Sequence, residues 1–122
     1  MQVIRNEMLI MVDVDDTLVI WGKIKKGQKA VLVTDPYNGE QIYLRPHVGH
    51  IKVLKDRKAR GAFITVWSAG GFLWAQAVVK ALNLEKYVDI YSNKPTMYIN
   101  DKEAHEILDK RLYLGLYSKY GT

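Results

Sequence analysis

A short apolar run that leads directly into a cluster of acids constrains this chain more than any other stretch. Residues 8–12 are all apolar, and Asp13, Asp15 and Asp16 follow them. An apolar run of this length is typical of a strand that is buried on both faces at the centre of a parallel sheet. The acids then lie just past the carboxyl end of that strand, where open α/β sheets bind their ligands. The stretch therefore predicts an α/β fold with a site beside the first strand.

The same acids predict a cation site. Three carboxylates within four residues repel one another strongly unless a positive charge lies among them. A hard divalent cation with oxygen ligands relieves that repulsion, and Mg²⁺ is the cation that these residues favour. The alternative is an acidic turn after the strand, or a helix start that Asp16 or Thr17 caps. Both interpretations stay open on this stretch alone.

Length and composition describe one globular domain. The 122 residues can form a real core but leave no room for a second domain, and 48% of them are hydrophobic. No apolar run approaches the roughly 20 residues of a membrane span, and the N-terminus lacks the pattern of a signal peptide. The absence of cysteine excludes disulfides, zinc–thiolate sites and cysteine catalysis. We therefore expect a cytoplasmic protein that does not enter membranes.

The charge balance favours an anionic partner. The formal net charge of +5 fits nucleic acid, but an enzyme for any phosphorylated compound also benefits from a positive potential. A helix predicted over residues 46–60, with Pro46 at an early helical position, carries many of the basic residues. We interpret its basic face as solvated, with contact to nucleic acid as the alternative. His47 and His50 are expected to be solvated or capping side chains in that helix, because no third zinc ligand has a suitable spacing.

A β-hairpin is predicted directly after the first strand. Residues 30–34 and 41–44 are strand-like, and Pro36, Asn38 and Gly39 between them are strong turn formers. The hairpin either covers a site at the strand ends or only extends the edge of a sheet. The remaining predicted elements are strands at 62–67, 87–91 and 97–100 and helices at 72–82 and 102–110. The tail at 111–122 carries tyrosines, and we expect it to pack on the core or to add an edge strand. Stacking of these tyrosines on a base is the alternative.

Ser68 follows the second predicted strand and precedes a glycine-rich helix start. Ala69, Gly70 and Gly71 come next. A small hydroxyl residue beside free backbone N–H groups and the positive end of a helix dipole makes a site for an anion. The alternative is that Ser68 only caps the helix. Lys94 follows the next strand and can offset the charge of a phosphoryl group and of the acids.

Four motifs in this order resemble those of the haloacid dehalogenase (HAD) superfamily of phosphohydrolases. The matching residues are Asp13-Val-Asp15-Asp16-Thr17, Ser68, Lys94-Pro95 and Asp101. Asn100 departs from the fourth motif, where an acid is commoner. The resemblance covers residues 8–103, and its capless form is similar to polynucleotide 3′-phosphatase domains and small HAD protein phosphatases. It implies a three-layer Rossmann-like fold with a central parallel sheet. A β-hairpin flap is implied directly after the first strand of that sheet.

The resemblance also implies a single domain over residues 1–122 without a cap, and a sheet with the first strand in the middle. The strands at 62–67 and 87–91 are expected on one side of it and the strand at 97–100 on the other. The implied catalytic residues are Asp13 as nucleophile, Asp15 as general acid and base, and Lys94. Ser68, Ala69 and Lys94 are implied to bind the substrate. Asp13, Asp15 and Asp101 are implied to hold Mg²⁺.

These residues lead to an expected function. The chain is expected to hydrolyse phosphomonoesters with Mg²⁺ through an aspartyl-phosphate. Since neither gap between the motifs can hold a cap domain, the site is open, which suits a macromolecular phosphate such as a nucleic-acid 3′-phosphate end. The alternatives are a phosphatase of a small phosphorylated metabolite or nucleotide, and a non-catalytic module that binds phosphate or nucleic acid. An oligomer could supply the missing lid, and the oligomeric state is left open.

Overall fold

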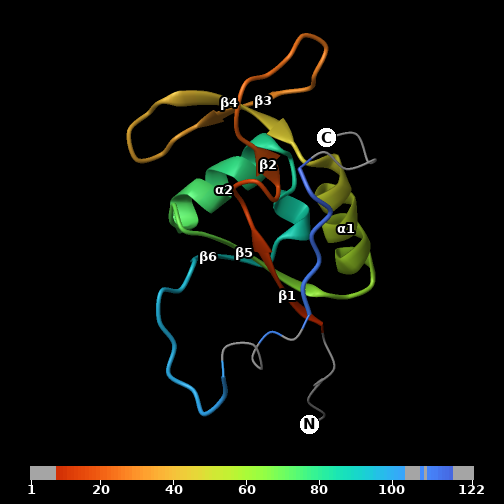
Figure 1. Ribbon diagram of the computed structural model, residues 1–122, viewed down its shortest axis with the longest axis vertical. Coiled ribbons are helices and arrows are strands. Elements are labelled where there is room, and N and C mark those ends of the chain that lie inside the picture. Colours follow the sequence, from red (N-terminus) through yellow and green to blue (C-terminus); the bar gives the residue numbers. More distant parts are fainter. Residues whose placement is uncertain (1–7, 104–107, 109, 117–122) are drawn as a thin grey trace.

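The computed structural model describes residues 8–103, 108 and 110–116 (Figure 1). Its elements in chain order are β1 (Leu9–Asp13), β2 (Val19–Ile20), β3 (Val31–Thr34), β4 (Gln41–Pro46), α1 (Val48–Ala59), β5 (Phe63–Ser68), α2 (Phe72–Ala81), the 3₁₀ turn η1 (Glu85–Tyr87) and β6 (Ile90–Asn93). None of the helices in these ranges has both the length and the apolar character needed to cross a membrane.

A parallel three-stranded sheet forms the core, in the order β1-β5-β6. Ile10 pairs with Ile64 and Val12 with Val66, so these four side chains share one face. They belong to the same hydrophobic cluster as Leu54 of α1 and Val78 of α2. Both helices therefore cover that face of the sheet, as expected when both crossovers have the usual right hand. The predicted α/β class is therefore confirmed, whereas the described residues do not show a third layer.

The predicted position of the first strand is wrong. Among the strands that the structure describes, β5 lies in the middle and β1 lies at an edge, because residues 97–100 do not form the strand that was expected beside β1. Those residues are exposed, and Ile99 keeps 91% of its surface accessible. β1 is also not fully buried, because Leu9 is 70% exposed and the other four residues are half-buried. An apolar run thus predicted a strand correctly but not how many neighbours it has.

The predicted β-hairpin is confirmed. β3 and β4 pair antiparallel, and the short strand β2 pairs with the other edge of β4. The turn is closed by the side chain of Asp35, whose Oδ1 accepts the Tyr37 N–H at 2.9 Å, and by Gly39, whose φ of +75° suits glycine. Figure 1 shows this hairpin beyond the end of β1 at which its acids lie.

Several predicted boundaries shift by a few residues. α1 begins at Val48 rather than Pro46, because Pro46 ends β4 and His47 is the N-cap. The strand predicted at 87–91 is β6, Ile90–Asn93, because η1 occupies the preceding residues. Gly61, with φ of +93°, ends α1 as expected. The helix predicted at 102–110 falls mostly outside the described residues, as do Tyr117 and Tyr120 of the tail.

His47 and His50 are both buried, so the expectation that they are solvated is wrong. The expectation of a cap is right for His47, which is the N-cap of α1, whereas His50 lies inside the helix. Nδ1 of His47 accepts the His50 N–H at 3.0 Å, and the two rings stack 3.8 Å apart. Nδ1 of His50 contacts the Thr17 carbonyl oxygen at 2.7 Å, while its Nε2 accepts the Leu114 N–H at 2.9 Å. Nε2 of His47 contacts the Gly115 carbonyl oxygen. The pair therefore joins the tail to the loop that follows Asp13.

Acid is expected to weaken the fold through His50. Burial lowers the pKa of His50, the Thr17 carbonyl opposes that change, and the neighbouring His47 adds to it. The unfolded chain therefore takes up a proton near pH 6.5, before the folded protein does. The free energy of unfolding should fall from about pH 6.5 downward, by at most about 1.4 kcal/mol per pH unit for this group. Urea unfolding at pH 7.5 and 5.5 measures this decrease in the free energy of unfolding.

His50→Gln is the control for that prediction. The glutamine cannot take up the proton, so the loss of stability between the two pH values should become smaller than in the wild type. An equal loss in both proteins would contradict the assignment to His50.

Candidate active site

The carboxyl ends of β1, β5 and β6 bring three of the predicted residues to one edge of the sheet. Asp13 ends β1, Ser68 ends β5, and Lys94 directly follows β6. Nζ of Lys94 lies 3.8 Å from Oδ2 of Asp13, and the Lys94 N–H donates to the Ser68 carbonyl oxygen at 2.9 Å. The order of parallel strands alone produces this convergence, because all their carboxyl ends lie on the same side.

Asp13 is accessible at this edge. Its side chain is 35% exposed, and Oδ2 also accepts the Thr17 hydroxyl at 3.5 Å. The positive charge of Lys94 lies near the same oxygen, where it can attract an incoming anion. Asp13 can therefore meet a phosphate from solvent.

A tight turn positions Asp15. The Val14 carbonyl oxygen accepts N–H groups from Thr17, Leu18 and Val19, so the chain reverses directly after the acids. Asp16 occupies the left-handed region at φ of +56°, which aspartate tolerates, and its Oδ1 accepts the Trp21 N–H at 3.1 Å. The turn returns Trp21 to the neighbourhood of Asp15. Asp16 thus acts as a turn residue.

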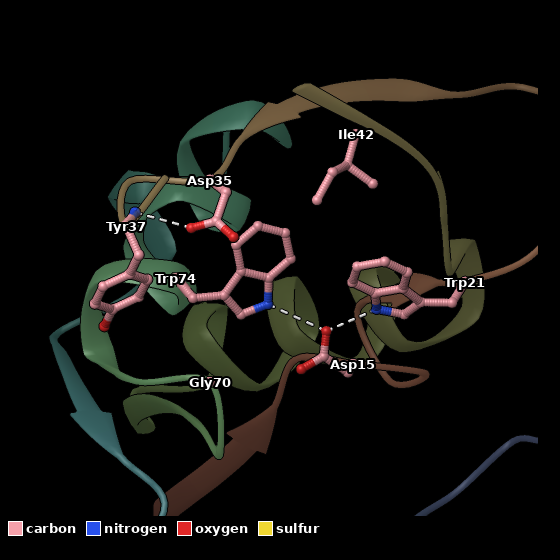
Figure 2. A pocket seen from close by; sticks show the side chains of 7 residues that line it. All are labelled: Asp15, Trp21, Asp35, Tyr37, Ile42, Gly70 and Trp74. Atoms are coloured by element: carbon pink, nitrogen blue, oxygen red, sulfur yellow. Dashed lines mark hydrogen bonds between the residues drawn. The ribbon is translucent and has the colours of Figure 1, made fainter. Parts of the chain in front are cut away.

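Two indole rings hold one oxygen of Asp15 (Figure 2). Oδ1 accepts Nε1–H of Trp21 at 2.7 Å and Nε1–H of Trp74 at 3.1 Å. Oδ2 lies 3.4 Å from the hydroxyl of Ser68, which is fully buried. Neither tryptophan was predicted as a site residue, because Trp74 fits the apolar stripe of α2 and nothing local to Trp21 signals its partner.

Side-chain oxygens of the protein itself accept backbone N–H groups at and just before the start of α2. Ser68 Oγ accepts the Gly70 N–H at 3.0 Å, and Oδ1 of Asn93 accepts the Phe72 N–H at 2.6 Å. Gly71 is the N-cap of α2, so the alternative that Ser68 caps this helix is wrong. The Ser68 hydroxyl closes the turn before the helix, and Ala69 lies exposed in that turn. Asn93 was not predicted. It lies at the end of β6, so only the tertiary fold brings it to this helix.

Asp101 does not join the other acids. It is exposed, and the segment of residues 94–103 leaves the sheet as a long loop (Figure 1). Within the part of the chain that is described, no group of three or more His, Cys, Asp or Glu side chains could hold a metal ion. Mg²⁺ is nevertheless commonly held by one or two carboxylates together with water and substrate phosphate. Asp13 and Asp15 fit that donor set, and Asp101 as a third ligand stays a prediction.

An open cleft of about 270 Å³ lies beside Asp15. Its lining residues, here called the aromatic cleft, are Asp15, Trp21, Asp35, Tyr37, Ile42, Gly70 and Trp74 (Figure 2). The hairpin supplies Asp35, Tyr37 and Ile42, so it forms one wall. The position of the hairpin is therefore compatible with a flap over the site.

Gly71→Ala is expected to disturb the contact between the hairpin and α2. Gly71 has φ of +99°, and an added Cβ would clash with the hydroxyl oxygen of Tyr37. The backbone strain alone costs about 1–3 kcal/mol of unfolding free energy. Urea unfolding measures the loss. Adding Tyr37→Phe removes the clashing oxygen and should recover part of it, whereas no recovery would show that only the backbone strain matters.

In comparisons with known proteins, no family model, no curated protein and no solved structure matched this chain. The resemblance to the HAD superfamily therefore remains a prediction that depends on the four motifs.

Proposed function

We propose that the chain is a Mg²⁺-dependent phosphomonoester hydrolase of the HAD type. One observation supports this best. Asp13, Asp15, Ser68 and Lys94 come from three separate segments, yet contacts of 3.4 Å and 3.8 Å link them in two pairs at one edge of the sheet. A nucleophilic carboxylate beside a second carboxylate, a hydroxyl and an ammonium group is the set that phosphoryl transfer through an aspartyl-phosphate needs.

The proposed reaction has two steps. A carboxylate oxygen of Asp13 attacks phosphorus in line, a bond from that oxygen to phosphorus forms, and the bond from phosphorus to the ester oxygen breaks. Asp15 gives its proton to the leaving oxygen. Water then attacks the aspartyl-phosphate, Asp15 takes up one of its protons, and phosphate leaves with Asp13 restored. Ser68, the backbone at Ala69 and Lys94 bind the oxygens of the transferring group.

The indole contacts specify which oxygen of Asp15 carries the proton. An indole N–H can only donate, so Oδ1 must remain an acceptor in both protonation states. The proton therefore resides on Oδ2. The Ser68 hydroxyl can donate or accept, and it can turn its hydrogen when Oδ2 is protonated. Trp21 and Trp74 are positioning residues for this acid.

Asp13 and the backbone carbonyl of Asp15 would hold Mg²⁺, with Asp101 as the third ligand that the resemblance implies. When bound, the ion supplies positive charge that shields the Asp13 carboxylate from the charge of the phosphate. The substrate class favoured by the open site and the net charge of +5 is a macromolecular phosphate, such as a nucleic-acid 3′-phosphate end. A small phosphorylated metabolite or nucleotide is the alternative.

A second candidate is a non-catalytic module that binds phosphate or nucleic acid. The exposed position of Asp101, away from Asp13, favours it. Phosphate release from a panel of phosphomonoesters, with Mg²⁺ or with EDTA, separates the two functions. Release that needs Mg²⁺ supports the hydrolase. No release from any compound by folded protein would reject the hydrolase and leave the binding module.

A further inference from the structure

The aromatic cleft lies where a leaving group must lie. In the proposed function, which this inference depends on, Asp15 protonates the leaving oxygen and must therefore touch it. Asp15 also lines the aromatic cleft, whereas Asp13 and Lys94 do not. With the phosphoryl group on the Asp13 side, the alcohol part of the substrate would extend from Asp15 toward the aromatic cleft, whose lining residues Figure 2 shows.

The walls of the aromatic cleft suit a flat ring. Trp21 is 45% exposed and Tyr37 is 57% exposed, although both side chains are large and apolar. Trp21 and Trp74 have ring centroids 6.0 Å apart with planes tilted by 36°. A guest ring between them would need about 3.5 Å on each side, so it cannot enter that gap. Within the aromatic cleft it can instead lie against the exposed part of the Trp21 ring, in the space that the hairpin residues also line.

Polar groups narrow the identity of the ring. The indole N–H groups of Trp21 and Trp74 both donate to Asp15, so the rings offer faces rather than donors. Asp35 uses Oδ1 for the Tyr37 N–H, and its carboxylate retains capacity to accept further hydrogen bonds. An acceptor at the wall of a stacking site fits a ring that carries amino or imino hydrogens, which nucleobases have and a phenyl ring lacks.

Basic residues continue from the same wall. Lys23, Lys25, Lys26 and Lys29 are exposed on the loop that begins just after Trp21 and leads to β3. Figure 1 shows this loop beyond the carboxyl end of β1, on the side of the hairpin. Such lysines fit the phosphates of a chain that continues past the bound base.

We propose that the aromatic cleft binds the base of the nucleotide that carries the phosphate. The substrate class is then a nucleoside phosphomonoester, either free or at the end of a polynucleotide. Base stacking on Trp21 orients the ester oxygen toward Asp15 and gives the site its preference. Base–aromatic stacking tolerates all four bases, so little base specificity is expected.

The test compares matched substrates. One is an oligonucleotide with a 3′-terminal nucleoside phosphate, and the other is identical except that its terminal residue lacks the base. We expect the base to raise kcat/KM by at least about fivefold. A free nucleoside 3′-monophosphate distinguishes the two sources, because the lysine loop should favour the oligonucleotide. Equal kcat/KM with and without the base, or preference for a phosphotyrosine peptide, would overturn the proposal.

Three variants locate the effect. Trp21→Leu removes the ring and should reduce the base preference to near unity, whereas Trp21→Phe keeps a ring and should retain a preference. The matched control is Tyr43→Leu, because Tyr43 is a 63% exposed aromatic residue of the same hairpin that does not line the aromatic cleft. A loss of preference in the control as large as that in Trp21→Leu would also overturn the proposal.

A binding measurement separates failure of this proposal from failure of the proposed function. Fluorescence anisotropy gives the affinity of Asp13→Asn for both labelled oligonucleotides without turnover. If no substrate is hydrolysed, a base site would still be supported when Asp13→Asn binds the base-free oligonucleotide more weakly than the intact one. That difference in affinity should disappear when Trp21→Leu is added to Asp13→Asn. Equal binding of the two oligonucleotides would overturn the base site, whatever the outcome for hydrolysis.

Discussion

Asp13→Asn is expected to lower phosphomonoester hydrolysis by at least about 10³-fold while the protein stays folded. The amide oxygen of asparagine is a poor nucleophile, so no aspartyl-phosphate forms. The fold should survive, because Asp13 is 35% exposed and its contacts to Thr17 and Lys94 are long, at 3.5 Å and 3.8 Å. Phosphate release in Mg²⁺ measures the first expectation, and urea unfolding measures the second.

Asp16→Asn is the matched control, since it makes the same chemical change three residues away. Asp16 has φ of +56° and accepts the Trp21 N–H. Asparagine tolerates that backbone conformation and can accept the same hydrogen bond, so hydrolysis should stay within a few-fold of the wild type. An equal loss of hydrolysis in both variants would indicate that removing any one negative charge from this turn has the effect. It would argue against Asp13 as the nucleophile.

His47→Ala is expected to lower the free energy of unfolding by about 2–4 kcal/mol. The change removes the N-cap of α1, a fully buried ring and the contact of that ring with His50. It also leaves the Gly115 carbonyl oxygen without its partner on His47. Urea unfolding at pH 7.5 measures the loss.

His47→Asn distinguishes the cap from the rest of that loss. Asparagine is a strong N-cap and can accept the His50 N–H, so it should recover about 1 kcal/mol relative to alanine. The exposed Gln76 of α2 is the reference position, and Gln76→Ala should change stability by less than about 0.5 kcal/mol. A cost for His47→Ala as small as that would contradict the structural role of the pair.

Hydrophobic periodicity and turn residues predicted most of the elements. The first strand, the hairpin, α1 and α2 were each located to within two residues, because their signals lie within the segments themselves. The strand predicted at 97–100 is absent, although Met97 and Ile99 have suitable side chains. A strand needs a partner, and these residues are exposed and pair with none of the described strands.

The α/β class and the meeting of Asp13, Ser68 and Lys94 follow from local sequence patterns, because parallel strands end on the same side of a sheet whatever surrounds them. The surroundings of these residues depend on contacts between distant segments. Trp74 lies 59 residues from Asp15 and donates to it, and the tail contacts His47 and His50 from more than 60 residues away. A polar side chain is buried only where such distant partners satisfy it. Folding therefore set the environment of the acid and the burial of the histidines.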